Sequence, residues 1–192
     1  MTEPRGQAYF ERLYAADPDP WRFASSDYER TKYAATLAAL PDRRFSRGFE
    51  VGCSIGVLTR QLATRCNTLL AVDVAPIALD QARVRCEDLP SVTFAPMAVP
   101  DAWPEGGFDL IVFSEVLYYL DAEARRETAR RTVSSLLPGG VVVLVNWRGE
   151  TGSVCTGDEA AAGFVADTAP RLCPAARQAT ASYRLDVLLL RG

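Results

Sequence analysis

Three runs of almost uninterrupted apolar residues constrain the fold of this chain more than any other feature. They are Thr68–Val74 (TLLAVDV), Phe108–Ser114 (FDLIVFS) and Val141–Asn146 (VVVLVN). Strands that do not alternate between apolar and polar residues are buried on both faces, which is typical of parallel sheets covered by helices. Helical stretches separate these runs, so the sequence predicts a doubly wound α/β fold with a mostly parallel sheet.

The other elements follow from turn residues and capping patterns. We expect further strands at Gly48–Val51, Val92–Phe94 and Ser182–Leu190, the last at an edge of the sheet. Helices are expected at about Gly6–Ala16, Ser26–Leu40, Val57–Cys66, Ile77–Glu87, Asp121–Leu137 and Thr156–Ala169. Two of these helices open with the spacing of a capping box, a hydroxyl followed three residues later by a glutamate: Ser26 with Glu29, and Thr156 with Glu159. We expect one domain over residues 1–192, with residues 1–45 as a helical cap over the active site and 46–192 as the sheet core.

The composition excludes several kinds of chemistry. The chain has no histidine, so mechanisms that need an imidazole are excluded, and its five scattered cysteines show no metal-ligand spacing. We therefore expect no metal. The net charge of −3, with no run of like charges, argues against a nucleic-acid partner. No apolar stretch is long enough to span a membrane, and the amino terminus lacks the pattern of a secretory signal, so a cytoplasmic location is expected.

A glycine-punctuated turn at a strand-to-helix junction is the main sign of a ligand site. It contains Glu50, Gly52, Ser54 and Gly56, and Asp73 closes the next strand 21 residues after Gly52. Ligands of open α/β sheets bind at the carboxyl ends of the strands, where small residues permit close approach and an acid can accept ribose hydroxyls. The pair of features therefore predicts a ligand that contains ribose.

The spacing of the turn does not fit the common nucleotide motifs. A dinucleotide fingerprint needs glycine two and five residues after the first glycine, but this chain has Ser54 and Val57 there. The phosphate-binding Gly-Lys-Ser/Thr sequence is also absent. An oxidoreductase that uses NAD is therefore the weaker alternative.

The order of motifs resembles that of class I S-adenosylmethionine-dependent methyltransferases. The turn reads Glu-x-Gly-x-Ser-x-Gly, in which Ser54 replaces the usual glycine. The resemblance continues through Asp73, Phe108–Val112 and the sequence Leu137-Pro138-Gly139-Gly140, which stands where a loop before the fifth strand is expected. It implies that the sheet has seven strands and that the cofactor is S-adenosyl-L-methionine, with S-adenosyl-L-homocysteine as product. It also implies further cofactor contacts at Val74, Ser114, Met97 and Ala98, of which Met97 stands where an adenine-binding aspartate is usual.

At a narrower level the chain resembles the NodS family of nodulation proteins over most of its length. The strings that carry this resemblance are DPWRF (19–23), SDYER (26–30), EVGCSIGVLT (50–59), SEVLYYL (114–120) and GDEA (157–160). The resemblance implies N-methylation of an amine on an amino sugar at the end of a chitooligosaccharide. Trp147-Arg148-Gly149 follows Asn146, where NodS is expected to have histidine, so the acceptor stays open between such an oligosaccharide and another small molecule.

Methyl transfer requires the acceptor and the methyl carbon to be held in line, and an amine must also lose a proton before it attacks. Glu115, directly after a strand, is the first candidate to accept that proton or to stabilise the developing cation. Tyr118 and Tyr119 are candidates to line the acceptor pocket. Asp158 is more simply explained as an acid in the first turn of a helix.

The expected helical cap adds candidates for cofactor binding. Trp21 is expected over the cofactor or the acceptor pocket, where its ring attracts a cation. Arg30 or Tyr33 is expected to bind the methionine carboxylate. An O- or N-methyltransferase of specialised metabolism, and a catalytically silent protein that binds the cofactor, remain as alternatives. The sequence leaves the choice between monomer and homodimer undecided.

Overall fold

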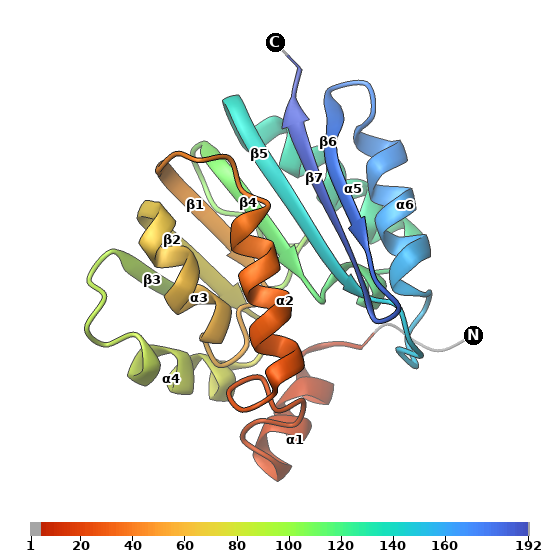
Figure 1. Ribbon diagram of the computed structural model, residues 1–192. Helices are drawn as coiled ribbons and strands as arrows, with labels where there is room; N and C mark the ends of the chain where they lie inside the picture. The colour runs from red at the N-terminus through yellow and green to blue at the C-terminus, as the bar shows by residue number, and fades with distance from the viewer. Residues whose placement is uncertain (1–4, 192) are drawn as a thin grey trace.

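The computed structural model describes residues 5–191, whose strands form one seven-stranded sheet (Figure 1). The strands are β1 (Phe45–Val51), β2 (Cys66–Asp73), β3 (Val92–Pro96), β4 (Phe108–Ser114), β5 (Leu136–Trp147), β6 (Leu172–Ala179) and β7 (Tyr183–Leu190). Their order is β3-β2-β1-β4-β5-β7-β6, in which β7 pairs antiparallel with both β5 and β6 and all other pairs are parallel. The predicted doubly wound, mostly parallel sheet is confirmed.

Helices cover both faces of the sheet. They are α1 (Gln7–Ala16), α2 (Asp27–Ala38), α3 (Val57–Leu62), α4 (Pro76–Arg85), α5 (Ala122–Ser135) and α6 (Gly157–Thr168), with short 3-10 turns at Ala63–Arg65 and Leu117–Tyr119. In β4, Leu110 and Val112 belong to the core beneath α2 and α3, whereas Ile111 and Phe113 belong to the core beneath α5 and α6. Burial on both faces explains why this strand has no polar alternation.

The last strand is not an edge strand, which corrects the expectation for Ser182–Leu190. β7 lies between β5 and β6, and β6 forms the edge. The sequence of β6, LCPAARQA, gave no strand signal because most of its side chains are exposed, so it needs no apolar pattern. β7 by contrast is mostly buried and has the apolar residues of an inner strand.

Two local expectations at helix ends also need correction. Ser26 caps α2 by accepting the Glu29 N–H, but the Glu29 side chain does not return to the cap and instead bonds Lys32, so only half of this capping box forms. The complete box occurs at α6, between Thr156 and Glu159. Residues 137–140 are not a separate loop before the fifth strand, because β5 already begins at Leu136 and these residues form an irregularity within it.

The carboxyl ends of the parallel strands all lie at the same end of the sheet, and α1 lies across that end (Figure 1). Two contacts hold this segment in place. The Phe10 ring meets the Tyr119 ring edge-on with 5.0 Å between centroids, and Arg5 Nη2 donates to the Gly152 carbonyl over 2.6 Å. The amino-terminal helices thus close one side of the space beyond the strand ends.

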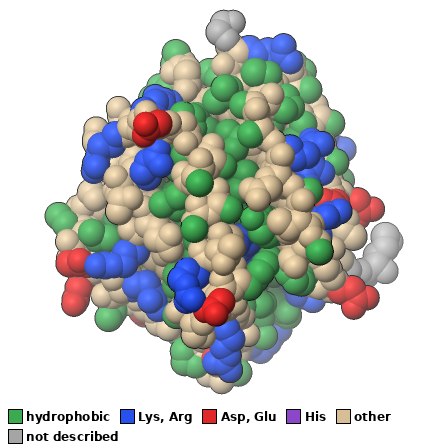
Figure 2. Space-filling model, in the orientation of Figure 1, with side chains coloured by type: hydrophobic (Ala, Val, Ile, Leu, Met, Phe, Trp, Pro, Cys, Tyr) green, Lys and Arg blue, Asp and Glu red, His purple; other side chains and the backbone are tan. Residues whose placement is uncertain are grey.

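No helix in the described part of the chain is a candidate membrane span, because each is too short or too polar to cross a bilayer. On the face drawn in Figure 2, charged side chains of both signs lie mostly toward the edges and uncharged side chains cover the middle.

Candidate active site

A cavity of about 970 Å³ lies beyond the carboxyl ends of the strands. This volume is at the upper end of the range for small-molecule sites. Its walls come from α1, α2 and the segments that follow β1, β2, β3, β4 and β5. The structure brings most of the predicted site residues to this wall: Trp21, Glu50, Gly52, Ser54, Asp73, Val74, Met97, Ala98, Ser114, Glu115, Tyr118 and Tyr119. Among the candidates, Gly56, Arg30 and Asp158 do not line it.

The glycines of the turn are required by their protein neighbours. Gly52 has φ +79°, and a Cβ there would lie 2.2 Å from Cγ2 of Val116. Gly56 has φ +80°, and its Cβ would lie 3.0 Å from the backbone of Ala82 in α4. Left-handed φ and the lack of space both favour glycine. Ser54 adopts φ +50° between them, and its hydroxyl bonds the hydroxyl of Tyr14, which ties the turn to α1.

Asp73 braces the turn from the end of β2. Its two carboxylate oxygens accept the N–H groups of Ser54 and Ala75, each over 2.9 Å. Burial raises the pKa of Asp73, and these N–H donors oppose the increase in part. Each oxygen of a carboxylate has a second lone pair, so the group can accept hydroxyl donors from a ligand in the cavity while it holds the turn.

Glu50 is a buried acid on the cavity wall, and among residues 5–191 no donor meets its carboxyl oxygens in good hydrogen-bond geometry. Burial raises its pKa to about 8, an increase that the neighbouring Thr59 hydroxyl opposes and the Asp73 carboxylate reinforces. A buried carboxyl without a well-placed donor is costly to leave ionised. Its position therefore fits a ligand that brings a cation or a hydrogen-bond donor.

Glu115 stands just past β4 with φ +60°, an uncommon backbone conformation for a residue other than glycine. Three donors fix its carboxylate. Oε1 accepts Lys32 Nζ over 2.6 Å, and Oε2 accepts the Tyr118 hydroxyl over 2.9 Å and the Trp147 N–H over 2.7 Å. The carboxylate predicted to accept the proton or to stabilise the cation is thus a rigidly held group on the cavity wall.

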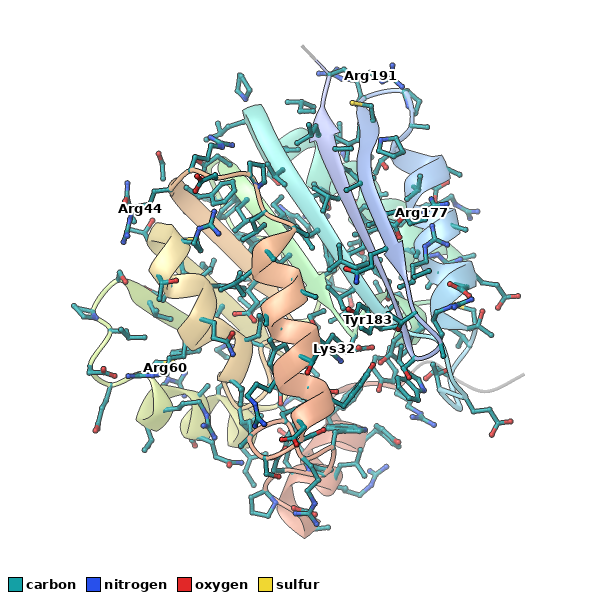
Figure 3. The ribbon with its side chains drawn as sticks, viewed as in Figure 1. Lys32, Arg44, Arg60, Arg177, Tyr183 and Arg191 are labelled. Atoms are coloured by element: carbon teal, nitrogen blue, oxygen red, sulfur yellow. The ribbon has the colours of Figure 1, made fainter. Side chains whose placement is uncertain are left out.

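Lys32 and Glu29 join this group, although the sequence reasoning assigned neither to the site. Lys32 is only 2% exposed, and its Nζ also lies 3.0 Å from the Glu29 carboxylate. Figure 3 shows Lys32 reaching from α2 toward the ends of the central strands. Burial disfavours the charged amine, but the Glu115 and Glu29 carboxylates outweigh it and raise the pKa of Lys32. The available signal was that Lys32 is the chain's only lysine.

Aromatic side chains form the rest of the wall. Trp21 stacks on Phe23 with 5.5 Å between ring centroids and meets Tyr14 at 5.7 Å. On the other side, Tyr28 meets Trp147 edge-on at 5.7 Å, and both line the cavity.

Two residues weighed for binding roles do not line the cavity. Arg30 is largely exposed and pairs with Asp27 one turn earlier on α2, whereas Tyr33 does line the cavity. Asp158 is not part of the cavity wall and pairs with Arg148 over 2.9 Å.

The residues present fit an adenosyl amino acid. Asp73, at the end of β2, offers acceptors for two ribose hydroxyls, and Glu50 is a buried acid without a well-placed donor, which an ammonium would supply. Within residues 5–191, cysteine and acidic side chains do not form any group of three or more that would hold a metal ion.

Comparison with known proteins identifies one family. The family model described as Nodulation protein S (NodS) matches residues 5–168. Nodulation protein S of Bradyrhizobium diazoefficiens is 34% identical over 152 residues, which span 78% of this chain and 72% of that protein. Nodulation protein S of Rhizobium tropici is 37% identical over 134 residues, 69% of this chain and 56% of that protein.

Solved structures agree. The N-methyltransferase NodS from Bradyrhizobium japonicum WM9, in complex with S-adenosyl-l-homocysteine, is 28% identical with a TM-score of 0.83, covering 97% of this chain and 98% of that one. A putative methyltransferase from Pseudomonas syringae is 36% identical with a TM-score of 0.69, covering 84% of this chain and 98% of that one.

Proposed function

The chain belongs to the nodulation protein S (NodS) family of S-adenosylmethionine-dependent methyltransferases, and we propose that it N-methylates an amine on an amino sugar or another small acceptor. The observation that carries this proposal is the composition of the cavity beyond the strand ends. One part of its wall holds the glycine turn, Glu50 and Asp73, and another holds Glu115 with its partners. The cavity therefore offers a cofactor subsite and an acceptor subsite in one space.

The cofactor subsite is formed at the ends of β1, β2 and β3. We assign the ribose to Asp73, the adenine to Val74, Met97 and Ala98, and the amino-acid end to Glu50 and the turn around Ser54. Trp21 and Ser114 complete this part of the wall. When bound, S-adenosylmethionine supplies an activated methyl group and leaves as S-adenosylhomocysteine.

The acceptor subsite contains Glu115, Tyr118 and Tyr119. An amine becomes positively charged when it gains a methyl group, and a fixed carboxylate beside it stabilises that charge. Lys32, Tyr118 and the Trp147 N–H hold Glu115 in place, so little reorganisation is needed during transfer. Glu115 is also the candidate to accept the proton that the amine must lose before attack.

The helical segment up to residue 45 acts, in this proposal, as a cap over the active site. Contacts of Phe10 with Tyr119, and of Tyr14 with Ser54, support it. A closed cap excludes water, which strengthens the electrostatic interactions inside the cavity. We place the enzyme in the cytoplasm.

Calorimetric titration with S-adenosylhomocysteine, and with NAD as control ligand, tests the cofactor assignment. We expect binding of the first ligand only. Asp73→Asn, which keeps the shape of the side chain, should weaken it at least tenfold, whereas exposed Asp42→Ala should not. Thermal melting of both variants separates lost binding from lost folding. Binding of NAD alone, or of neither ligand, would overturn the assignment.

A turnover assay then tests the acceptor. We expect methyl transfer to a chitooligosaccharide with a free terminal amine and none to its fully acetylated form. Transfer to hydroxyl groups only would make the protein an O-methyltransferase. Cofactor binding without turnover on any amine tested would favour a silent binding protein.

A further inference from the structure

Three charged side chains meet in the acceptor part of the cavity, and their charges do not balance. Lys32 Nζ lies 2.6 Å from Glu115 Oε1 and 3.0 Å from Glu29 Oε1, so one cation stands between two carboxylates. Glu29, Lys32 and Glu115 all line the cavity and are almost fully enclosed by protein. We call these three residues the charge cluster. With all three ionised, its net charge is −1.

A surplus charge in a buried cluster is unfavourable unless another group neutralises it. Glu115 accepts three donors on its two oxygens, from Lys32, Tyr118 and the Trp147 N–H. Both oxygens of Glu29 lie 3.0 Å from the same Lys32 Nζ, but only Oε1 is in hydrogen-bond geometry with it, and the Tyr33 hydroxyl stands beside this carboxylate. The surplus is therefore associated with Glu29. Burial also raises the pKa of Glu29, as expected for an acid whose charge is not fully compensated.

Aromatic rings next to the charge cluster favour a cation as well. The Tyr28 ring lies 5.3 Å from Lys32 Nζ and meets the Trp147 indole edge-on. The faces of aromatic rings attract cations, and ammonium groups are commonly recognised by such rings together with a carboxylate. Tyr28 and Trp147 both belong to the cavity wall, so a ligand can reach them.

We propose that the charge cluster makes the acceptor subsite selective for ammonium-forming acceptors, and that Glu29 is the specificity-determining residue because it supplies the surplus negative charge. This inference rests on the proposed methyltransferase function and adds a residue that selects nitrogen over a neutral hydroxyl. A bound ammonium brings the net charge of the cluster to zero. A hydroxyl acceptor of the same shape leaves the surplus charge uncompensated.

The charge movement during the reaction agrees with this arrangement. The amine first gives up one proton to the Glu115 carboxylate, the base of the proposed function, and its lone pair then forms the bond to the methyl carbon. The carbon–sulfur bond breaks, its electron pair stays on sulfur, and the positive charge ends on nitrogen. The groups that face Glu29 are Lys32 and Tyr33 on α2 and Glu115 beyond β4. Lys32 is the only cation among them, and it is already shared by two acids.

The experiment compares Glu29→Gln with Asp27→Asn, an exposed acid on the same turn of α2. Each variant is assayed with a chitooligosaccharide bearing a terminal amine. For Glu29→Gln we expect the KM for this acceptor to rise about tenfold, since a unit charge lost a few ångströms away weakens an ion pair by this order. We expect kcat to change less than threefold and the Kd for S-adenosylhomocysteine to stay within twofold. Asp27→Asn should match the wild type.

A conservative variant and a second measurement separate charge from shape and from folding. Glu29→Asp restores the charge and should recover most of the KM. In the wild-type enzyme, an analogue whose terminal nitrogen is a quaternary ammonium should inhibit about tenfold more strongly than the neutral N-acetyl analogue. This comparison needs no variant, so it tests the proposal even if Glu29→Gln fails to fold.

Three results would overturn the inference while the proposed function stands. They are an unchanged KM in Glu29→Gln, an equal loss of S-adenosylhomocysteine binding, or equal inhibition by the charged and neutral analogues. The second would mean that the charge cluster serves the cofactor. If instead the wild-type enzyme transfers no methyl group to any amine, the proposed function itself fails.

Discussion

The buried carboxyl of Glu50 should make the stability of the ligand-free protein depend on pH in a way that a single substitution removes. Burial raises the pKa of this group to about 8 in the folded protein, against an ordinary value of 4.5. The folded state therefore binds one more proton than the unfolded state between these two values. The contribution of Glu50 to the free energy of unfolding is therefore largest below the lower value. It falls as the pH rises and levels off above about pH 8.

The size of the effect follows from proton linkage. A difference of one bound proton changes the free energy of unfolding by about 1.4 kcal/mol per pH unit. Between pH 6 and pH 7.5 the wild-type protein should therefore lose about 2 kcal/mol through Glu50. For a chain of this size that corresponds to a fall in Tm of roughly 4–8 °C. Glu50→Gln keeps the shape of the side chain but cannot ionise, so this part of the pH dependence should vanish.

Thermal melting of both proteins in matched buffers across pH 5.5–8.5 measures the difference between the two pH slopes. All other titrating groups are common to both proteins, so their contributions cancel. Glu87→Gln, at an exposed position after α4, is the matched control and should keep the wild-type slope. If the curves for wild type and Glu50→Gln run parallel, Glu50 is not a protonated buried acid in the free protein, and its assignment as a site awaiting a cationic ligand fails.

Two further substitutions test how the site is supported. Gly52→Ala should destabilise the protein by roughly 2–3 kcal/mol in urea unfolding, because its Cβ would lie 2.2 Å from Val116 at a φ of +79°; an unchanged midpoint would mean that the turn tolerates a side chain. Thr156→Ala removes the cap of α6, where the Thr156 hydroxyl accepts the Glu159 N–H over 3.2 Å. It should lower the free energy of unfolding by about 1 kcal/mol while the Kd for S-adenosylhomocysteine stays constant, and a change in that Kd would show that α6 influences the site.

The inner strands of the sheet could be predicted because burial on both faces leaves a continuous apolar pattern. β4 has the predicted bounds, Phe108–Ser114. The edge strand β6 could not be found in this way. Its side chains face solvent, and its pairing with β7 uses backbone groups that any residue provides. The missing strand then made β7 look like the edge.

The same limit applies to the site. Glu50, Asp73 and Glu115 were identified because each closes or lies near the end of an apolar strand, where the topology brings ligands. Glu29 was interpreted as a helix cap, since its spacing from Ser26 fits one. Whether a glutamate in the first turn of a helix bends back to the cap or inward to Lys32 depends on what the sheet places opposite the helix. Sequence spacing does not contain that information.

Uncommon backbone conformations occur mainly beside the cavity. In the described part of the chain, the residues other than glycine with left-handed φ are Arg22, Ser54 and Glu115. Ser54 and Glu115 line the cavity, and Arg22 follows Trp21, which does too. Such conformations cost of order 1–3 kcal/mol each and persist only where surrounding contacts enforce them. Here the contacts are the Tyr14 hydroxyl at Ser54 and three donors at Glu115. The strained backbone at Ser54 and at Glu115 places both residues on the wall of the same cavity. A site that holds two substrates at once requires such an arrangement.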